Sequence, residues 1–506
     1  MSDSTTVVAF VAVIGGTSLL AVTARRFGRR DELPHLTSWA LASRQFGPVV
    51  TWFLLGSTIY TAYTFAAVPG LVYGVGALAF FAVPYTVIVY PMAYVLLPRL
   101  WSAAREHGYV TVADFVRGRY SSPLLALAVA VTGILATMPY LALQLLGIRA
   151  VLVAGGLYPR GITGDLALVA VFAVLAAATY RHGLRAPAVI SLVKGVIIFA
   201  AVFAVVVVAL RRLGGPGEIF VAAERNLAGS GVPEASLTLD PQLFPAFATL
   251  ALGSAMALLM YPHVLTATFA ADSADTLRKV SIALPAWTAV LALFSFLGVA
   301  ALAAGIDAPA GNAEAALPLL VKELMPAALT GLVFGAFAVG ALVPAAVMSI
   351  AAATLFVRNI YVEYFHATAT PKHQTRVAQL VSLIAKVGAL GFVFGLRDQD
   401  AINLQLLGGV WILQTFPAVA IGLFTAWFHR GALLTGWAVG MVGGTLMVVW
   451  SGFSSVVTVG TGGWQMQVYA AVVALVLNLA VAALLTPLLG RDAPLPAGAG
   501  SGRAVR

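Results

Sequence analysis

Runs of about 20 apolar residues recur along the whole chain, and they constrain the possible fold more than any other feature. Each run is long enough to cross a hydrocarbon core of about 30 Å as a helix. Of the 506 residues, 61% are hydrophobic and only 9% are charged, and the mean hydropathy is +0.96. Soluble domains are roughly 45–50% apolar and about 25% charged. We therefore expect an all-α integral membrane protein and exclude a soluble fold.

The residue pattern also argues against other classes. An outer-membrane barrel has short strands of alternating polarity, and the sequence shows no such series. The chain contains no cysteine, so disulfides and cysteine metal sites are excluded. The net charge of +10 comes from basic residues beside the apolar runs rather than from one patch. This placement indicates membrane orientation rather than nucleic-acid binding.

The sequence predicts about thirteen transmembrane helices in one transporter domain over residues 1–490, followed by a disordered tail at 491–506. Asp3 precedes the first run, whereas a signal peptide has positive charge at that place. We therefore expect a retained helix with its N-terminus outside. Basic residues follow it, namely Arg25, Arg26, Arg29 and Arg30. The thirteen expected spans are 6–24, 47–74, 77–97, 124–153, 164–180, 188–210, 244–268, 281–303, 326–357, 377–396, 403–428, 431–452 and 465–487.

The basic residues set the expected orientation. With the N-terminus outside and the C-terminus in the cytoplasm, 20 of the 29 Lys and Arg residues fall in inner segments. Six fall in outer segments, at Arg160, Arg211, Arg212, Arg225, Lys322 and Arg397. This asymmetry agrees with the positive-inside rule and with an odd number of spans. The longest outer segment, 211–243, is expected to hold at most a short surface helix.

Two spans carry polar residues and helix breakers in their middle. The second span has a dense series of hydroxyls between Ser57 and Thr64 and then Pro69-Gly70. The seventh contains Tyr261-Pro262-His263. Interrupted helices in corresponding positions of two halves indicate a transporter site, although a proline can also merely kink a helix. Helices 2 to 6 (about 47–210) would then form one repeat, and helices 7 to 11 (about 244–428) a second, inverted one.

Ionisable residues inside the spans are few. No Asp or Glu lies well within a predicted span, so a proton relay through buried carboxylates is not expected. Lys194 and Lys386 do lie within spans. Each is either a functional buried ammonium or a side chain that reaches to the cytoplasmic interface, and the sequence leaves both interpretations open.

Several motifs occur in the order typical of one family. They are Ser57 to Tyr73, Glu106-His107-Gly108-Tyr109-Val110-Thr111-Val112-Ala113-Asp114-Phe115 with Arg119-Tyr120, Tyr261-Pro262-His263, and Arg358-Asn359-Ile360-Tyr361. With these motifs the chain resembles the sodium:solute symporter family. Four further stretches resemble its bacterial monocarboxylate permease branch, namely Met138 to Leu145, Gly183 to Ala188, Ala341 to Ala353 and Leu404 to Thr415.

The resemblance implies a five-plus-five inverted-repeat fold in the bacterial inner membrane, with helices 2 and 7 broken. It also implies uptake of acetate, propionate, pyruvate or lactate. In the family, sodium is held by carbonyls at the break of the second span and by hydroxyls of the ninth. The corresponding positions here are Ser57, Tyr60, Gly340, Val343 and Pro344. Since Val343 and Pro344 carry no hydroxyl, the sodium site looks degraded, and a register shifted by six residues would supply only Ser349.

A lysine replaces the sodium ion in some proton-coupled transporters of this fold, and Lys194 is a candidate for that role by analogy. The coupling ion is thus H⁺ or Na⁺, and no other cofactor is expected. The expected substrate contacts are Thr58, Thr61, Tyr63, Thr64, Gln144, Tyr261, His263, Trp411 and Gln414. Expected partners are a small carboxylate and the lipid bilayer, without nucleic acid or an obligatory protein partner.

Other functions stay open at this point. The nearest alternative is a sodium symporter for another small solute such as proline or pantothenate. A channel would lack uphill accumulation. A membrane sensor or an enzyme is disfavoured, because no signalling domain and no nucleophile, base and orienter arrangement is evident.

Overall fold

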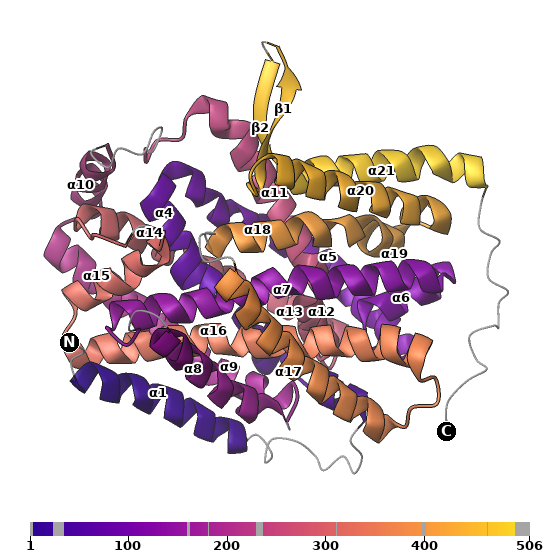
Figure 1. Cartoon of the computed structure of the whole chain (residues 1–506), viewed down its shortest axis with the longest axis horizontal. Coiled ribbons are helices and arrows are strands. Elements are labelled where there is room, and N and C mark those ends of the chain that lie inside the picture. The colour runs from indigo at the N-terminus through magenta and orange to yellow at the C-terminus, as the bar shows by residue number, and fades with distance from the viewer. Residues whose placement is uncertain are drawn as a thin grey trace.

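The computed structural model describes residues 4–23, 35–158, 162–180, 182–228, 236–309, 311–395, 401–462 and 464–490. Within these ranges the chain is nearly all helix, and most helices lie side by side in one bundle (Figure 1). The predicted tail at 491–506 lies outside the described residues. So do the basic residues expected to flank the first and other spans, at Arg25, Arg26, Arg29, Arg30, Arg160 and Arg397.

The described residues of the first half of the chain form ten α-helices and three short helices of other types. The α-helices are α1 (Ser4–Thr23), α2 (Leu36–Leu41), α3 (Pro48–Ile59), α4 (Val68–Val75), α5 (Ala82–Glu106), α6 (Val112–Tyr120), α7 (Pro123–Ala154), α8 (Ile162–Tyr180), α9 (Arg185–Leu213) and α10 (Pro216–Ala228). The others are the 3₁₀ helices η2 (Ala42–Arg44) and η4 (Ala77–Phe81) and the π-helix η3 (Tyr63–Ala67). Helix α10 is the surface helix expected within 211–243.

The second half adds the remaining helices and a hairpin. Its α-helices are α11 (Phe244–Met260), α12 (Pro262–Phe269), α13 (Ala274–Ala283), α14 (Pro285–Ala303), α15 (Ala316–Leu324), α16 (Ala327–Phe356), α17 (Pro371–Gly395), α18 (Ala401–Ile412), α19 (Gly422–Phe424), α20 (Arg430–Trp450) and α21 (Ala470–Leu489). Short 3₁₀ and π helices are η5 (Pro241–Leu243), η6 (Ala313–Ala315), η7 (Val357–Phe365), η8 (Leu413–Thr415) and η9 (Pro417–Ile421).

In the described part of the chain, nine helices are long and apolar enough to cross a membrane, and the bent pair α3 and η3–α4 makes a tenth. The predicted spans 6–24, 164–180 and 377–396 coincide with α1, α8 and α17, which are not among these ten. The chain is thus a multi-pass helical membrane protein. The total of thirteen spans and the inverted repeats stay predictions.

Helices α7 and α16 lie in the middle of the bundle, and α20 and α21 lie together at one edge (Figure 1). The most apolar window of the span that contains α16 is entirely buried, whereas only 33% and 28% of the corresponding windows of α20 and α21 are buried. Helix α16 contacts both α7 and α1. A helix that is apolar all round is expected to be buried in this way.

The last predicted span begins too early. Residues Trp464–Tyr469 form strand β2, which pairs antiparallel with β1 (Val456–Thr461) in a hairpin at the edge of the bundle (Figure 1). Helix α21 starts only at Ala470. The segment alternates apolar with polar residues, Trp-Gln-Met-Gln-Val-Tyr, which is a strand pattern. The hydropathy averaged over the predicted span 465–487 did not reveal that alternation.

The prediction of a break at Pro69-Gly70 is wrong. The second span is interrupted at Tyr60, and Pro69 lies in the first turn of α4. Pro is tolerated there because η3 is a π-helix whose hydrogen bonds are already displaced by one residue. Gly70 serves close packing instead: a Cβ on Gly70 would lie 2.9 Å from the backbone N of Glu314.

Candidate functional site

The first interruption opens the backbone of the second span. Helix α3 ends at Tyr60, whose φ and ψ of −96° and 91° are extended, and the chain resumes helically with a bend of 49°. An α-helix would pair each carbonyl with the amide four residues later. At the break this pairing stops, and carbonyl oxygens must find other donors because the membrane offers no water.

Lys194 supplies the donor for two of these carbonyls. Its Nζ lies 2.9 Å from the carbonyl oxygen of Ser57 and 3.0 Å from that of Tyr60. The Lys194 side chain comes from α9 and is buried, with 1% of the residue exposed. Among the described residues no carboxylate forms an ion pair with it. The two carbonyls that the resemblance assigns to sodium therefore accept hydrogen bonds from the Lys194 side chain in this structure.

Gln144 of α7 satisfies the other side of the same break. Its Oε1 accepts a hydrogen bond from the amide of Ala62 at 3.0 Å, and its Nε2 donates to Thr61 Oγ1 at 3.3 Å. Thr61 Oγ1 in turn accepts from the amide of Tyr63 at 3.1 Å. Thr58 bonds back to its own helix, at the carbonyl of Leu55. The predicted residues Thr61, Tyr63 and Gln144 are thus brought together.

The second interruption lies between α11 and α12 at Tyr261, where the sequence predicts it. Tyr261 is extended, with φ and ψ of −62° and 132°, and α12 begins at Pro262. His263 follows in the first turn and is fully buried. Its ring lies 5.3 Å from the ring centroids of both Tyr140 and Tyr261. Tyr261 Oη donates to the carbonyl of Gln405 at 3.2 Å.

Several buried polar atoms around the two breaks have no hydrogen-bond partner within the described protein. They are both ring nitrogens of His263, Tyr63 Oη, Thr64 Oγ1 and Ser57 Oγ. Buried polar groups without partners are rare because each costs about 1–3 kcal/mol. Donors left free in this way are the groups that a polar ligand would satisfy.

Tyrosines surround this region more densely than the sequence analysis anticipated. Tyr85 packs edge-on against Tyr63 with ring centroids 5.9 Å apart, and Tyr140 packs against Tyr261 at 5.1 Å. Tyr469, at the start of α21, donates from its hydroxyl to the carbonyl of Leu406. All five of these tyrosines are buried. A buried tyrosine needs a polar partner for its hydroxyl. A tyrosine within an apolar span therefore indicates a polar site nearby, and this could have identified Tyr85, Tyr140 and Tyr469 from the sequence.

The three predicted positions on α16 offer no hydroxyl. A Cβ on Gly340 would lie 2.8 Å from the ring of Phe65, and Val343 is buried in a small apolar cluster with Ile190 of α9. Pro344 lies inside α16. Ser349, the alternative ligand, donates to its own helix and accepts from Ser382 of α17 at 3.1 Å. Lys386 is buried and donates to Ser382 at 2.9 Å.

Two predicted substrate contacts point to other helices. Trp411 donates from Nε1 to Thr445 of α20 at 3.0 Å. Gln414 accepts from Asn478 of α21 at 3.1 Å and donates to its own helix. The structure therefore does not bring Trp411 or Gln414 to the two breaks. Through these hydrogen bonds, Trp411 links α18 to α20 and Gln414 links η8 to α21 at the edge of the bundle.

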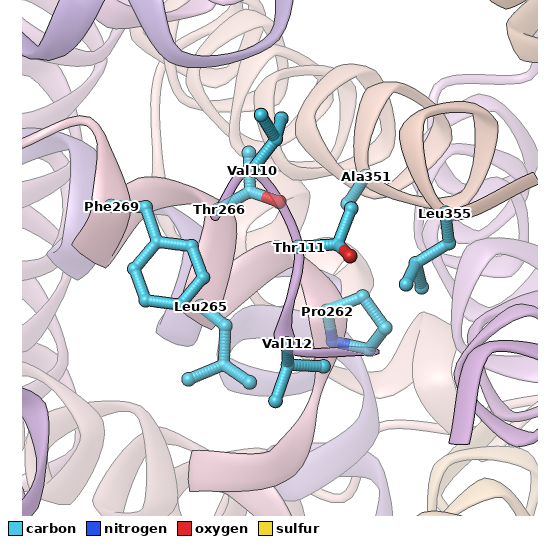
Figure 2. A pocket seen from close by; sticks show the side chains of 9 residues that line it. All are labelled: Val110, Thr111, Val112, Pro262, Leu265, Thr266, Phe269, Ala351 and Leu355. Carbon is cyan, nitrogen blue, oxygen red and sulfur yellow. The ribbon is translucent and has the colours of Figure 1, made fainter. Parts of the chain in front are cut away.

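A small pocket adjoins the second break (Figure 2). Its walls come from α12, from α16 and from the segment before α6, and they include Pro262, Thr266, Ala351 and Thr111. The hydroxyl oxygens of Thr111 and Thr266 are its polar atoms among the side chains shown (Figure 2).

Hydrogen bonds hold in place the segment before α6 that lines this pocket. Asp114 caps α6 together with Thr111, and its carboxylate accepts from Asn359 at 2.9 Å and lies 3.5 Å from Arg358. Thr111 Oγ1 also donates to Asn359 at 2.8 Å. Two motifs that are far apart in sequence thus meet here. Nearby, the Arg44 guanidinium donates a hydrogen bond to the carbonyl of Tyr109. Burial, and to a smaller extent the positive charge of Arg105, lowers the pKa of Arg44 to about 10.

Comparisons with known proteins define the class. Residues 39–444 match the sodium:solute symporter family. A monocarboxylate transport permease protein of Rhizobium johnstonii is 45% identical over 98% of this chain and 99% of its own length. The uncharacterized symporter YodF of Bacillus subtilis is 35% identical over 76% of each chain. The chain belongs to the sodium:solute symporter family and is a membrane transporter of solutes.

The fold agrees with this assignment. A solved structure of a Na⁺-coupled sialic acid symporter, in a substrate-bound outward-open state, superposes with a TM-score of 0.77. It covers 97% of this chain and 100% of its own, at 14% sequence identity. At that identity the likeness concerns the fold alone.

Proposed function

We propose that this protein is a symporter that takes up small monocarboxylates such as acetate, propionate, pyruvate and lactate, with protons as the coupling ion. Proton coupling rests on one observation, the position of Lys194 Nζ within hydrogen-bond distance of the carbonyls of Ser57 and Tyr60. The substrate class rests on the 45% identical relative whose name gives monocarboxylate transport.

Lys194 would act as a fixed cation that carries a proton. When protonated, it bridges α9 to the broken end of α3 through two charge-assisted hydrogen bonds, as a bound sodium ion would. When the proton leaves to water on the inner side, the group becomes a neutral amine that has lost its positive charge and gained a lone pair, so the two hydrogen bonds are no longer charge-assisted and weaken. The two helices can then separate, and a proton from outside restores the first state. Arg cannot replace Lys in this cycle because it does not deprotonate.

The carboxylate would bind between the breaks. Tyr63 Oη, Thr64 Oγ1 and the ring of His263 are buried donors that await a partner. The first turn of α12 adds the positive end of a helix dipole near His263. A carboxylate has acceptors only, so a site with free donors and no buried acid favours it over a cationic solute. The tyrosine rings supply apolar walls for a short alkyl chain.

The wider architecture is part of the proposal. We place the N-terminus outside and the C-terminus in the cytoplasm of a bacterial inner membrane, in one domain of two inverted repeats at 47–210 and 244–428. Single cysteines introduced at Arg225 and Arg376 of this cysteine-free chain test the orientation. An impermeant thiol reagent added outside should label the first and not the second.

Transport in proteoliposomes tests the function. Labelled acetate, pyruvate and proline would be offered under an imposed proton gradient or an imposed sodium gradient. Uphill accumulation of the two carboxylates with the proton gradient alone supports the proposal. Sodium-driven accumulation of proline would support the alternative of a sodium symporter for another solute. Flux that only runs downhill would indicate a channel.

A further inference from the structure

A groove on the outer surface of the bundle is separate from the transport site. It lies between α5 and the irregular segment 416–424, and it encloses about 490 Å³. Its walls are apolar and include Met92, Val95, Phe416, Ile421 and Phe424. Ligand pockets usually hold about 300–1,000 Å³. The exposed fractions of Val95 and Phe424, 41% and 55%, show that the groove opens to the surroundings of the bundle.

The groove exists because the chain opposite α5 departs from α-helical geometry. The segment follows the 3₁₀ helix η8, contains the π-helix η9 and the short helix α19, and is followed by an extended Thr425. Irregular backbone at the membrane surface needs partners for its carbonyls. Helix α6 provides them: Arg119 Nε donates to the carbonyl of Gly422 at 2.9 Å, and Tyr120 Oη donates to that of Ala418 at 3.3 Å.

Positive charge gathers at one end of this apolar groove. The Arg99 guanidinium of α5 is exposed and lies 5.3 Å from the ring centroid of Phe424. It donates one hydrogen bond to the carbonyl of Val95 at 3.0 Å. Arg119 lies against the same short helix α19. A guanidinium has five N–H donors, and the described part of the protein uses one of them in each arginine.

We propose that the groove binds one anionic phospholipid, with an acyl chain along α5 and the headgroup phosphate on Arg99 and Arg119. An acyl chain matches the apolar walls, and a phosphate matches a forked guanidinium. The charged end lies beside α6, in the segment 98–123 that the charge asymmetry places in the cytoplasm. A lipid held there would brace α6 and α19 against α5, which contacts α11 and α12 on either side of the second break.

Lipid retention by the full chain tests this site. The purified protein would be relipidated with phosphatidylglycerol and phosphatidylcholine of identical acyl chains and analysed by native mass spectrometry. The wild type should keep phosphatidylglycerol in preference. Arg99→Gln should lower that preference about five-fold, the effect expected for one basic group at an anionic lipid. Arg376→Gln, at an exposed arginine on the cytoplasmic end of α17, should change nothing.

A second variant tests the contribution of the apolar groove separately from that of the Arg99 charge. Val95→Trp fills the groove from its exposed side and should reduce retention of both lipids, while the protein stays folded by its elution profile. The proposal is overturned if neither Val95→Trp nor Arg99→Gln alters the bound lipid. It is also overturned if the two lipids are retained equally by the wild type, or if Val95→Trp breaks up a dimer, because a second copy of the chain would then cover the groove.

Discussion

The two interrupted helices differ in which of their polar groups have hydrogen-bond partners. At the first break, Lys194 and Gln144 supply partners for the carbonyls of Ser57 and Tyr60 and for the amide of Ala62. At the second break, His263 is fully buried, and neither ring nitrogen has a hydrogen-bond partner among the described residues. The freed backbone groups of the first break therefore have partners within the protein. The hydroxyls of Tyr63 and Thr64 at the first break and the ring of His263 at the second have no hydrogen-bond partner among the described residues.

Removing the cation at the first break should have the largest effect. We expect Lys194→Ala to abolish uphill accumulation of acetate, because two buried carbonyls lose their donor and no proton carrier remains. Lys194→Arg should still bind substrate but not turn over. Uptake into proteoliposomes under a proton gradient measures both. Lys322→Ala, at an exposed lysine of α15, is the matched control and should transport normally. Sodium-dependent uptake that survives Lys194→Ala would falsify the proton-coupled cycle.

His263→Phe should separate function from stability at the second break. A ligand hydrogen bond to a charged group contributes about 1.5–3 kcal/mol, so we expect KM for acetate to rise about 10- to 150-fold. The unfolding temperature should stay or increase, because Phe fits among Tyr140 and Tyr261 and removes two unpartnered nitrogens. A clear loss of thermal stability with unchanged KM would show that His263 belongs to the packing instead.

Gln144→Leu should give the opposite pattern at the first break. It leaves the amide of Ala62 and the hydroxyl of Thr61 without their partner, which should cost about 1–3 kcal/mol of folding free energy. A lower unfolding temperature in detergent is the readout. Gln467→Leu, at an exposed position of β2, serves as the control. If Gln144→Leu unfolds like the wild type, the first break is not held by α7.

Tyr63→Phe should have the smallest effect. Only one free hydroxyl is removed, and a neutral hydrogen bond to a ligand is worth about 0.5–1.5 kcal/mol, or about 2- to 10-fold in KM. Stability should not fall, since Tyr63 Oη has no hydrogen-bond partner within the described protein. Unchanged transport together with unchanged stability would remove Tyr63 from the substrate site.

The sequence was informative about which residues lie within a membrane span. It was poor at showing which neighbouring helix each side chain points to. It located the second break at Tyr261 and identified Lys194 as a lysine within a span, because both follow from the residue type and its distance from a helix end. It misplaced the first break by nine residues, since Pro69 is accommodated after a π-helix, which no local pattern announces. Trp411 and Gln414 looked like site residues but contact α20 and α21. Their direction depends on how α18 is rotated about its axis.

By itself, the sequence determined that this is a helical membrane protein, because long apolar runs and the scarcity of charge leave no other way to satisfy the backbone. It also determined the residue types available for coupling and binding. Only the tertiary structure decided that the Lys194 ammonium lies on the carbonyls of Ser57 and Tyr60, and that Gln144 closes the same break. The physical reason is that hydropathy fixes which residues enter the membrane, whereas the contacts that α7 and α9 make with the first break are set by packing between residues 82 to 137 positions apart in the chain.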